Sequence, residues 1–435
     1  MASAYVKHDD FTAPQRSAMS EILVAGAGTA GLVAAIALAQ AGFATCLIGP
    51  VDTRPSARTV ALLDGSMRLL KNLGLWDAVA PDTAPLAIMR LVDDTGSLFA
   101  APPVDFCAGE IGLEVFGHNI ETRLLVARLA EIAGKTPGLK VVDQRVAKIV
   151  FGSQNVTLAC EDGAAFSGKL LVGADGRDSL ARRSAPVPAR TWSYPQVALT
   201  AILAHARPHN SISTEFHTRA GPCTFVPLPA TSTEPHRSSL VWMMAPADAQ
   251  TRSALEDVAF ARSVERQAHS ILGAMRVAGA RGQFSMSGLM AQRSSAKRLA
   301  LVGEAAHVFP PIGAQGLNLG LRDVADLVDC LTEPSHRDGA PGGARTPLRL
   351  DDAHTLDHAL ASFDRLRRAD IATRSFGIDA LNRALLSDFL AVDFLRGAGL
   401  VALANLGPLR RAAMRAGIMP GRVATLMQPQ PANSR

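Results

Sequence analysis

The sequence predicts an α/β protein in which a Rossmann-like nucleotide-binding domain is interleaved with a β-sheet domain and followed by a helical C-terminal region. Three observations support this prediction. A glycine-rich turn joins a short apolar strand to a helix near residue 28, two later strands near residues 173 and 302 also end in glycine-containing turns, and a strand-rich stretch separates those two. Because one domain contributes segments on both sides of the other, a simple division into two halves does not describe the chain.

The first segment, residues 21–50, predicts a buried strand, helix and strand. No charged residue occurs between Ile22 and Val51, so by length the segment would also suit a membrane span. A single helix is disfavoured because Gly26-Ala27-Gly28-Thr29-Ala30-Gly31 interrupts it and Gly42 stands where a helix would end. Fully buried parallel strands are uniformly apolar, which favours a βαβ unit over a transmembrane helix.

The turn within this unit has the spacing of a phosphate-binding site. Gly26 permits the tight turn, Gly28 lets a pyrophosphate approach the backbone, and Gly31 lets the helix pack closely on the strand. The free N–H groups and the dipole of the helix N-terminus favour the phosphate charge. An acidic residue is expected at the end of the second strand to hold the ribose hydroxyls, but that position is Gly49, and Asp52 is the nearest acid.

The remaining chain is expected to alternate between helical and strand-rich segments. Helices are predicted at 56–80, 119–133, 255–275, about 316–331 and 356–418, strands at 140–150, 155–160, 165–173, within 190–245 and at 299–302, and an exposed loop at 333–350. The strand-rich insertion is expected to supply a binding wall that includes Phe216, Phe225, Pro227 and Trp242. For each of these residues alone, a place in the sheet core is the simpler expectation.

Two later segments carry polar residues at the ends of strands. The strand 171–174 leads into Asp175-Gly176, a pair that by itself is more simply explained as a β-turn. The strand 299–302 leads through Gly303-Glu304 and a Pro-Gly loop into a helix. A carboxylate at a strand end can hold sugar-like hydroxyls, and a glycine-rich helix N-terminus can face a flavin ring and stabilise its reduced, anionic form.

In this order and at this spacing, the three segments resemble the aromatic-hydroxylase class of flavoprotein monooxygenases. The third is most similar to the ubiquinone-biosynthesis hydroxylase (UbiH/UbiF) family, and the resemblance covers roughly residues 21–420. It implies an FAD cofactor. The residues that it places at FAD are Gly26, Gly28, Gly31, Arg58, Arg123, Asp175, Gly176, Gly303, Glu304, Gly316, Leu317 and Asn318, and those that it places at the reacting end are Pro311, Gly313, Gln315 and His307.

Some features of the third segment leave its interpretation open. His307 is either a structural histidine at a turn or an acid–base group, and no second ligand at metal-binding spacing accompanies it, so no metal site is predicted. The carboxylate that holds the ribityl chain is usually Asp in the family and is Glu304 here, and Gly313-Ala314 inverts the usual Ala-Gly pair. These departures indicate a divergent branch, because the carboxylate, the prolines, Gln315 and Gly316 are retained.

The pattern of segments along the chain predicts four units. They are a disordered tail at 1–20, an FAD-binding domain at 21–185 and 290–335, a substrate domain at 86–118 and 186–289, and a helical C-terminal region at 351–435. The tail is expected because the first twenty residues contain no apolar core segment.

The resemblance also implies a reaction. NADH or NADPH would dock transiently and reduce FAD, and O2 would then form a flavin C4a-hydroperoxide that hydroxylates the ring of a polyprenylated phenol or quinone precursor in ubiquinone biosynthesis. Two alternatives remain open: a hydroxylase of a small soluble phenol, and a non-catalytic flavin- or lipid-binding subunit that joins other ubiquinone-biosynthesis proteins. A related flavin enzyme, such as a prenyl reductase or a halogenase, is a further alternative.

The composition limits the partners and the compartment. The net charge is +5, but there is no zinc-finger spacing or basic patch interleaved with aromatics, which argues against nucleic acid. Five widely separated cysteines predict neither disulfides nor a metal site, and a cytoplasmic location is expected. After Asp393 the chain has six arginines and no acid, among apolar residues such as Leu406 and Leu409, which predicts peripheral contact with the inner face of a membrane.

Overall fold

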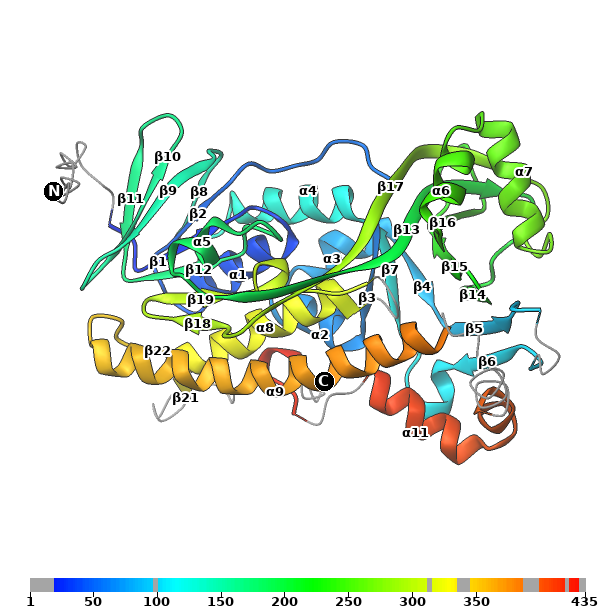
Figure 1. Ribbon diagram of the computed structural model, residues 1–435. Helices are drawn as coiled ribbons and strands as arrows, with labels where there is room; N and C mark the ends of the chain where they lie inside the picture. The colour runs from blue at the N-terminus through cyan, green and yellow to red at the C-terminus, as the bar shows by residue number, and fades with distance from the viewer. Residues whose placement is uncertain are drawn as a thin grey trace, which may run out of the picture.

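The computed structural model describes residues 19–96, 101–310, 315–334, 345–385, 399–418 and 422–429. Most of the loop expected at 333–350 lies outside the described residues. Almost all of the predicted N-terminal tail therefore lies outside the described residues. Figure 1 shows an elongated molecule with a mainly parallel sheet at one end and a larger sheet at the other. The long strands β13 (Ala189–His205) and β17 (Met275–Ala291) run between the two ends. The predicted α/β fold is confirmed.

The smaller of these sheets has six strands in the order β18-β19-β12-β1-β2-β8. Their bounds are Ile22–Ala25 (β1), Thr45–Ile48 (β2), Leu139–Val142 (β8), Leu170–Gly173 (β12), Ser295–Ala296 (β18) and Leu299–Leu301 (β19). β1 pairs in parallel with both β2 and β12, and β12 pairs in parallel with β19. The predicted βαβ start is thus confirmed, and the uniform apolarity of β1, β2 and β12 reflects burial on both faces.

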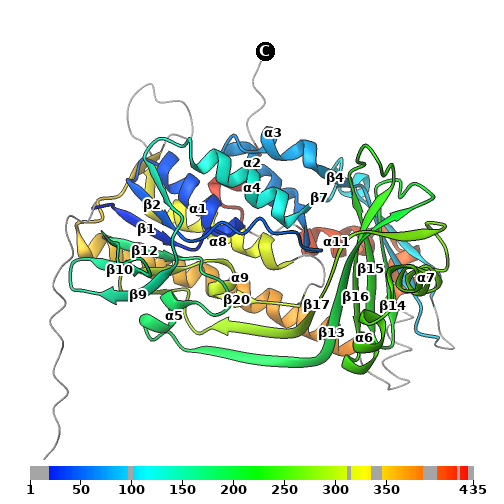
Figure 2. The same ribbon diagram turned by 90° about the horizontal axis from the view of Figure 1, so that it is seen from above.

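Helices cover one face of this sheet and a small antiparallel sheet covers the other. The helices are α1 (Thr29–Gln40), α4 (Thr122–Ala133) and α8 (Gln315–Leu331), and α1 contacts both of the others (Figure 2). On the opposite face, side chains of the sheet share a core with β9 (Val146–Phe151), β10 (Val156–Cys160), β11 (Ala165–Gly168) and α5 (Leu180–Ser184). The sheet is therefore sealed on both faces, and its strand ends are where a ligand can reach it.

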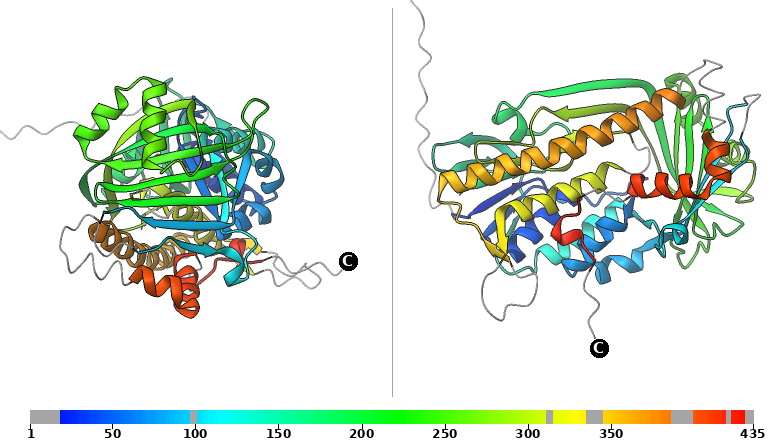
Figure 3. Two further views of the ribbon diagram at one scale, coloured as in Figure 1. Left: turned by 90° about the vertical axis from the view of Figure 1, so that its right-hand side faces the viewer. Right: turned by 90° about the horizontal axis from the view of Figure 1, so that it is seen from below.

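The larger sheet has eight strands in the order β20-β17-β13-β16-β15-β14-β5-β6. The strands not yet given are β5 (Ile88–Asp93), β6 (Val104–Cys107), β14 (Ile212–Thr218), β15 (Gly221–Leu228), β16 (Arg237–Met244) and β20 (His307–Val308). α6 (Pro246–Ser253) and α7 (Asp257–Gln267) pack against one part of its outer face (Figure 3). The other face is directed toward the nucleotide-binding part of the molecule.

A three-stranded sheet, β3-β7-β4, lies between the two larger ones and corrects two sequence predictions. It comprises β3 (Thr59–Leu63), β4 (Thr83–Leu86) and β7 (Gly117–Glu121). Between β3 and β4 the chain forms α2 (Asp64–Asn72), α3 (Trp76–Val79) and η1 (Ala80–Asp82), and η2 (Ala108–Ile111) precedes β7. The predicted helix at 56–80 was wrong at its start, because residues 59–63 pair with β7. The helix predicted from residue 119 begins at Thr122, because residues 119–121 complete that pairing.

The strand β17 was not predicted, and the helix expected at 255–275 ends at Gln267. Much of β17 is exposed to solvent, so its sequence contains glycines and arginines and lacks the apolar pattern of a buried strand. Pairing with β13 over nearly its full length makes it a strand. Tertiary pairing, and not local pattern, therefore determines this element.

The C-terminal part is mainly helical. α9 (Ala353–Leu385) runs beneath the molecule from the nucleotide-binding end toward the larger sheet (Figure 3), and α11 (Gly407–Ile418) packs beside η2. The other short elements are η3 (Gly303–Ala305), β21 (Thr332–Pro334), β22 (Arg345–Pro347) and η5 (Thr425–Met427). The domain boundaries given above remain predictions. No helix among the described residues is long and apolar enough to cross a membrane.

Candidate functional site

The three glycine-containing segments meet at one edge of the six-stranded sheet. β1, β12 and β19 are parallel neighbours, so their carboxyl ends at Ala25, Gly173 and Leu301 lie side by side. The chain leaves β1 toward β2 on one side, while β12 and β19 lie on the other. Such a reversal of strand order opens a crevice outside the strand ends, which is where open α/β sheets bind ligands.

The first segment is built by two glycines that cannot carry a side chain and one that faces open space. Gly26 has φ +104°, and a Cβ there or at Gly31 would overlap a backbone carbonyl, that of Ala174 or of Gly26 respectively. At Gly28, by contrast, a Cβ would meet no atom within 4 Å. No side chain caps the N-terminus of α1, and its first turn contains no acid. Open space beside uncapped N–H groups fits a pyrophosphate.

The end of β2 explains why no acidic side chain occupies the expected ribose position. A Cβ on Gly49 would lie 2.8 Å from Ala27 N and 3.0 Å from Gly26 Cα, so the glycine turn itself fills that space. Asp52, the nearest acid, is paired with a neighbouring arginine. Both of its carboxylate oxygens bind the Arg54 guanidinium, and hydrogen bonds from Arg54 lower the pKa of Asp52 to about 2.

The second segment is committed largely to internal contacts. Asp175 Oδ1 accepts a hydrogen bond from Ser179 Oγ at 2.5 Å, and Oδ2 accepts one from Ala181 N at 3.0 Å, which together secure the start of α5. Gly176 has φ +82° and follows directly. Arg177 Nη1 donates to Ser287 Oγ of β17 at 2.7 Å, so this turn also fastens the larger sheet to the nucleotide-binding end. The turn is thus structural, whatever else it binds.

The third segment packs against the first. Gly303 has φ +61°, a Cβ there would lie 3.2 Å from Ala30 Cβ, and a Cβ on Gly320 of α8 would lie 2.9 Å from Gly303 Cα. Glu304 is exposed just beyond the carboxyl end of β19, where a sugar-like chain could reach it. Pro311 and Gly313, predicted at the flavin ring, lie outside the described residues.

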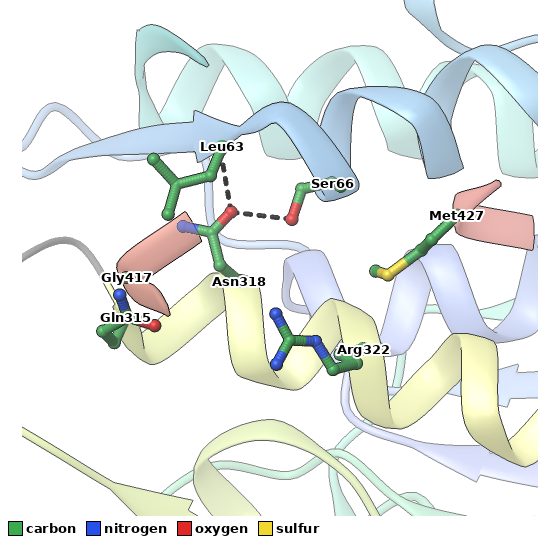
Figure 4. Close-up of a pocket in the computed structure, with 8 residues that line it drawn as sticks. Leu63, Ser66, Gln315, Asn318, Arg322, Gly417 and Met427 are labelled. Carbon is green, nitrogen blue, oxygen red and sulfur yellow. Dashed lines mark hydrogen bonds between the residues drawn. The ribbon is translucent and has the colours of Figure 1, made fainter. Parts of the chain in front are cut away.

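The start of α8 follows this loop and brings four predicted residues together. Gln315 and Leu317 are half-buried, and Gly316 has no atom within 4 Å of an added Cβ. The Asn318 side chain points toward Leu63 and Ser66 (Figure 4): Oδ1 accepts from Leu63 N and Ser66 Oγ, at 2.9 and 2.7 Å, and Nδ2 donates to the carbonyl of Ala61. Asn318 therefore fastens α8 to β3 and α2.

The two predicted arginines are neighbours. Thr122 N donates to the Arg58 carbonyl at 3.0 Å, which places Arg58 and Arg123 at one end of the three-stranded sheet. Arg123 is paired with Glu121, whose other carboxylate oxygen accepts from Arg237 at 2.8 Å. Arg58 is exposed, and its guanidinium lies 5.9 Å from the centre of the Phe284 ring in β17. Of the two, Arg58 is the more available to a ligand.

A buried charged cluster that the sequence did not predict supports the third segment. Asp323 of α8 accepts from Gly303 N at 2.8 Å and His307 Nε2 at 2.7 Å through Oδ2, and from Arg367 Nε at 2.6 Å through Oδ1. Arg367, on α9, is 1% exposed and also binds Asp326 and Asp370. Burial would raise the pKa of Asp323, but the charges of His307 and Arg367 outweigh it, and the pKa lies below its ordinary value.

This geometry favours the structural interpretation of His307. Its side chain is fully buried, and Asp323 orients it beneath Gly303. The signal that could have revealed the cluster was the pair of acids Asp323 and Asp326 on the apolar face of α8, but their partner Arg367 lies 44 and 41 residues further on. No group of His, Cys, Asp or Glu among the described residues could hold a metal ion.

The face of the larger sheet toward this site carries an apolar cluster, here called the inner apolar cluster. It contains buried residues of the sheet together with residues that flank the 311–314 loop and one residue of α9: Ala198, Met243, Met286, Phe309, Leu319 and Ile371. The binding wall expected at Phe216, Phe225 and Trp242 was wrong, because these side chains pack under α6 and α7 on the outer face. The simpler expectation for each of them, a place in the sheet core, is confirmed. Successive side chains of a strand point to opposite faces of the sheet, and these three point to the face under α6 and α7.

Comparison with known proteins agrees with this arrangement. The model of a family described as "FAD binding domain" matches residues 19–344. The chain belongs to this FAD-dependent monooxygenase family, and within it to the UbiH/UbiF-type aromatic-ring hydroxylases. It is 32% identical to ubiquinone hydroxylase UbiL of Rhodospirillum rubrum, over 91% of this chain and 89% of the relative.

Two further similarities span nearly the whole chain. The chain is 28% identical to 3-demethoxyubiquinol 3-hydroxylase of Escherichia coli, over 91% of this chain and 97% of the relative. The crystal structure of p-nitrophenol 4-monooxygenase PnpA from Pseudomonas putida superimposes with a TM-score of 0.72 at 16% identity, over 93% of this chain and 100% of that one. The second similarity shows a shared fold only.

Proposed function

We propose that this protein hydroxylates the aromatic ring of a polyprenylated phenol or quinone precursor on the route to ubiquinone. The observation that carries the proposal is the similarity to ubiquinone hydroxylase UbiL over 91% of the chain, together with retention of the flavin-type strand ends. The inner apolar cluster supports it, since its side chains can pack against an aromatic ring with a hydrocarbon tail. Burial of the ligand's own apolar surface contributes about 25 cal/mol per Å².

We assign one group of residues to binding FAD and another to excluding water from the reacting space. The open space at Gly28 and the N-terminus of α1 would hold the pyrophosphate, Glu304 would bind the ribityl hydroxyls, and the N-terminus of α8 would face the ring. FAD, when bound, supplies the redox and oxygen chemistry. Phe309, Leu319 and the cluster around them keep the reacting space apolar and dry.

The proposed electron donor is NADH or NADPH, with O2 as co-substrate. Among the described residues, one parallel sheet carries a glycine turn of the dinucleotide-binding type, and that turn is assigned to FAD. The nicotinamide donor would therefore dock transiently. Arg58 is a candidate for contacting it, because the side chain is exposed near Phe284 at the junction of the two sheets.

Complementation tests the proposed function directly. The chain is expressed in bacterial strains that each lack one ubiquinone ring hydroxylase, and quinone lipids are analysed by mass spectrometry. Restored ubiquinone in one strain identifies the ring position, whereas no restoration despite soluble yellow protein would favour a small phenol substrate or an accessory role. Gly31→Val, in which a side chain would displace the Gly26 carbonyl, is the matched inactive control.

We further propose that the C-terminal segment contacts the inner face of the cytoplasmic membrane, where a polyprenyl substrate resides. Apolar side chains are exposed there: Val401, Leu406 and Leu409 are 43%, 54% and 47% exposed. Arg415 is also exposed, and Arg411 is half-buried. Residues 399–405 and α11 pack against β6 and η2, at the far end of the larger sheet.

The structure reduces the number of arginines available for that contact. Arg410 forms an ion pair with Glu110 at 2.8 Å, and Arg422 forms one with Asp326 at 2.7 Å. A double variant, Leu406→Gln and Leu409→Gln, is expected to sediment less with vesicles containing anionic lipid. The control is Val258→Gln on α7, since Val258 is 66% exposed on the opposite side of the sheet. Equal sedimentation of all three proteins would exclude the contact.

A further inference from the structure

Gln196 holds a buried hydrogen-bond acceptor that lacks a donor. The residue lies in β13 and is 3% exposed, and its side-chain oxygen Oε1 has no hydrogen-bond partner among the described residues. Buried polar atoms are nearly always paired, because leaving one unpaired forfeits its hydration without return. An acceptor of this kind is available to a partner outside the protein chain, either an ordered water or a ligand group.

Two contacts fix the direction of this side chain. Gln196 Nε2 donates to the carbonyl of Ala220 at 2.8 Å, and rotating the amide would bring two oxygens together there. The amide nitrogen also packs against Gly221, which has φ +134°, and a Cβ at that position would lie 2.5 Å from it. The nitrogen is therefore held in place and the oxygen is presented on the other side of the amide.

The amide lies beside the inner apolar cluster. The same added carbon on Gly221 would lie 3.0 Å from Met243 Cβ, and Ala198 follows two residues later in β13. Met243 and Ala198 belong to the cluster that includes Phe309 and Leu319, which flank the flavin loop. The pairing of β13 with β17 shifts register between Ser193 and Val197, so Gln196 stands at an irregularity of the ladder. Such irregularities re-aim side chains at functional sites.

We propose that Gln196 Oε1 accepts a hydrogen bond from the hydroxyl of the aromatic substrate and thereby selects which ring carbon faces the flavin. This role rests on the proposed hydroxylase function, but it requires only a ring hydroxyl and no prenyl tail. Among apolar neighbours, a single acceptor orients a ring more strictly than contact area does, because every pose that leaves the hydroxyl or the amide unpaired is penalised. Gln196 is thus a positioning and specificity residue.

The test compares Gln196→Met with the wild-type holoenzyme, using 2-prenylphenol, phenol and prenylbenzene as probes. Affinities are read from changes in the flavin absorption spectrum, independently of turnover. Both phenols are expected to bind about tenfold more weakly to the variant or worse, while prenylbenzene, which lacks the hydroxyl, binds equally to both proteins. The melting temperature of the ligand-free variant is expected to rise, since an unpaired buried acceptor is gone and the exposed Ala220 carbonyl can bind water.

The control is Gln40→Met. Gln40 Nε2 makes the same kind of bond, to the carbonyl of Leu73 at 3.1 Å, but the residue is exposed. Its replacement is expected to leave the affinity for both phenols unchanged. This control removes an amide that donates the same kind of hydrogen bond but has no buried, unpaired oxygen. An effect seen only in Gln196→Met is therefore due to the buried oxygen.

Three results would overturn the assignment of Gln196. The first is that Gln196→Met changes the affinity for 2-prenylphenol and for prenylbenzene equally. The second is that this variant has a lower melting temperature and an unchanged affinity for phenol. The third is that no probe binds to the wild type. If phenol binds and is weakened by the variant while 2-prenylphenol does not bind, the role of Gln196 stands and the prenylated substrate is wrong. The failure of one proposal is therefore distinguishable from the failure of the other.

Discussion

The two regions that meet at Gly303 are built on opposite principles. On one side is the glycine junction, where Gly26, Gly31, Gly303 and Gly320 bring three segments into backbone contact. On the other is the buried charged cluster around Asp323 and Arg367. In the glycine junction the backbone segments lie so close together that there is no room for a side chain on these glycines. In the charged cluster each buried charge is balanced by its neighbours, so removing one residue leaves the others buried without a partner.

The largest effect is expected from removing the central charge. Arg367→Met leaves Asp323, Asp326 and Asp370 without their shared partner, and we expect the free energy of unfolding to fall by about 3–5 kcal/mol, as for other buried ion pairs that lose one member. Urea unfolding measures it. Arg365→Met, at an exposed site on the same helix, should change it by less than about 0.5 kcal/mol. Similar values for both would contradict the proposed balance of charges.

An added atom should damage the glycine junction nearly as much. Gly31→Ala forces a Cβ onto the Gly26 carbonyl, which is backbone and cannot move aside, so we expect a loss of about 3 kcal/mol in stability and protein purified without FAD. Gly28→Ala places the same atom in open space, so the stability should hold while FAD binding weakens. Flavin absorbance per protein and thermal unfolding measure both effects. A Gly31→Ala variant with full FAD content would refute the close contact.

Acid should weaken the charged cluster selectively. Because the folded pKa of Asp323 lies below its ordinary value near 3.8, its stabilising contribution is present above that value and is lost as the pH falls through the folded pKa. The wild type is therefore expected to lose stability faster than Asp323→Asn between pH 5 and roughly pH 3. Urea midpoints across this range test it, and parallel pH profiles would show that Asp323 does not contribute.

The smallest effect is expected where the cluster reaches solvent. The Arg422 side chain is 50% exposed while binding Asp326 at 2.7 Å and Asp329 at 3.6 Å. Arg422→Ala should cost less than about 1 kcal/mol, and less still at high salt, because water and ions screen an exposed pair. Unfolding measured at low and high ionic strength would reveal it. A loss as large as that of Arg367→Met would mean that burial does not determine the strength of these pairs.

The glycine junction could be predicted from the sequence because its signals are local. A glycine pattern, an apolar strand and a helix start lie within ten residues of one another, and each has one physical meaning at that spacing. The roles of Gly26 and Gly31 followed from steric limits that do not depend on the rest of the fold. Even Gly49, an apparent departure, is explained once the turn is seen to occupy its side-chain space.

The charged cluster and the substrate side could not be predicted in the same way. Arg367 reaches Asp323 across 44 residues, and nothing in either segment specifies the other. β17 is a strand only because β13 pairs with it, and alternation placed Phe216 and Trp242 on the outer face. The motif assigns Asn318 to FAD, but it did not predict the hydrogen bonds of this amide to β3 and α2. Long-range pairing decides each of these, and a single sequence does not record it.

The order in which the strands of the six-stranded sheet occur along the chain has a consequence for biosynthesis. β1 ends at Ala25, but its neighbours β12 and β19 end at Gly173 and Leu301. At about 5–20 residues per second, a ribosome needs roughly 14 to 55 seconds after making β1 before β19 exists. The α9 arginine that closes the cluster comes later still. FAD thus has no complete site on the growing chain, and its insertion must follow the synthesis of most of the protein.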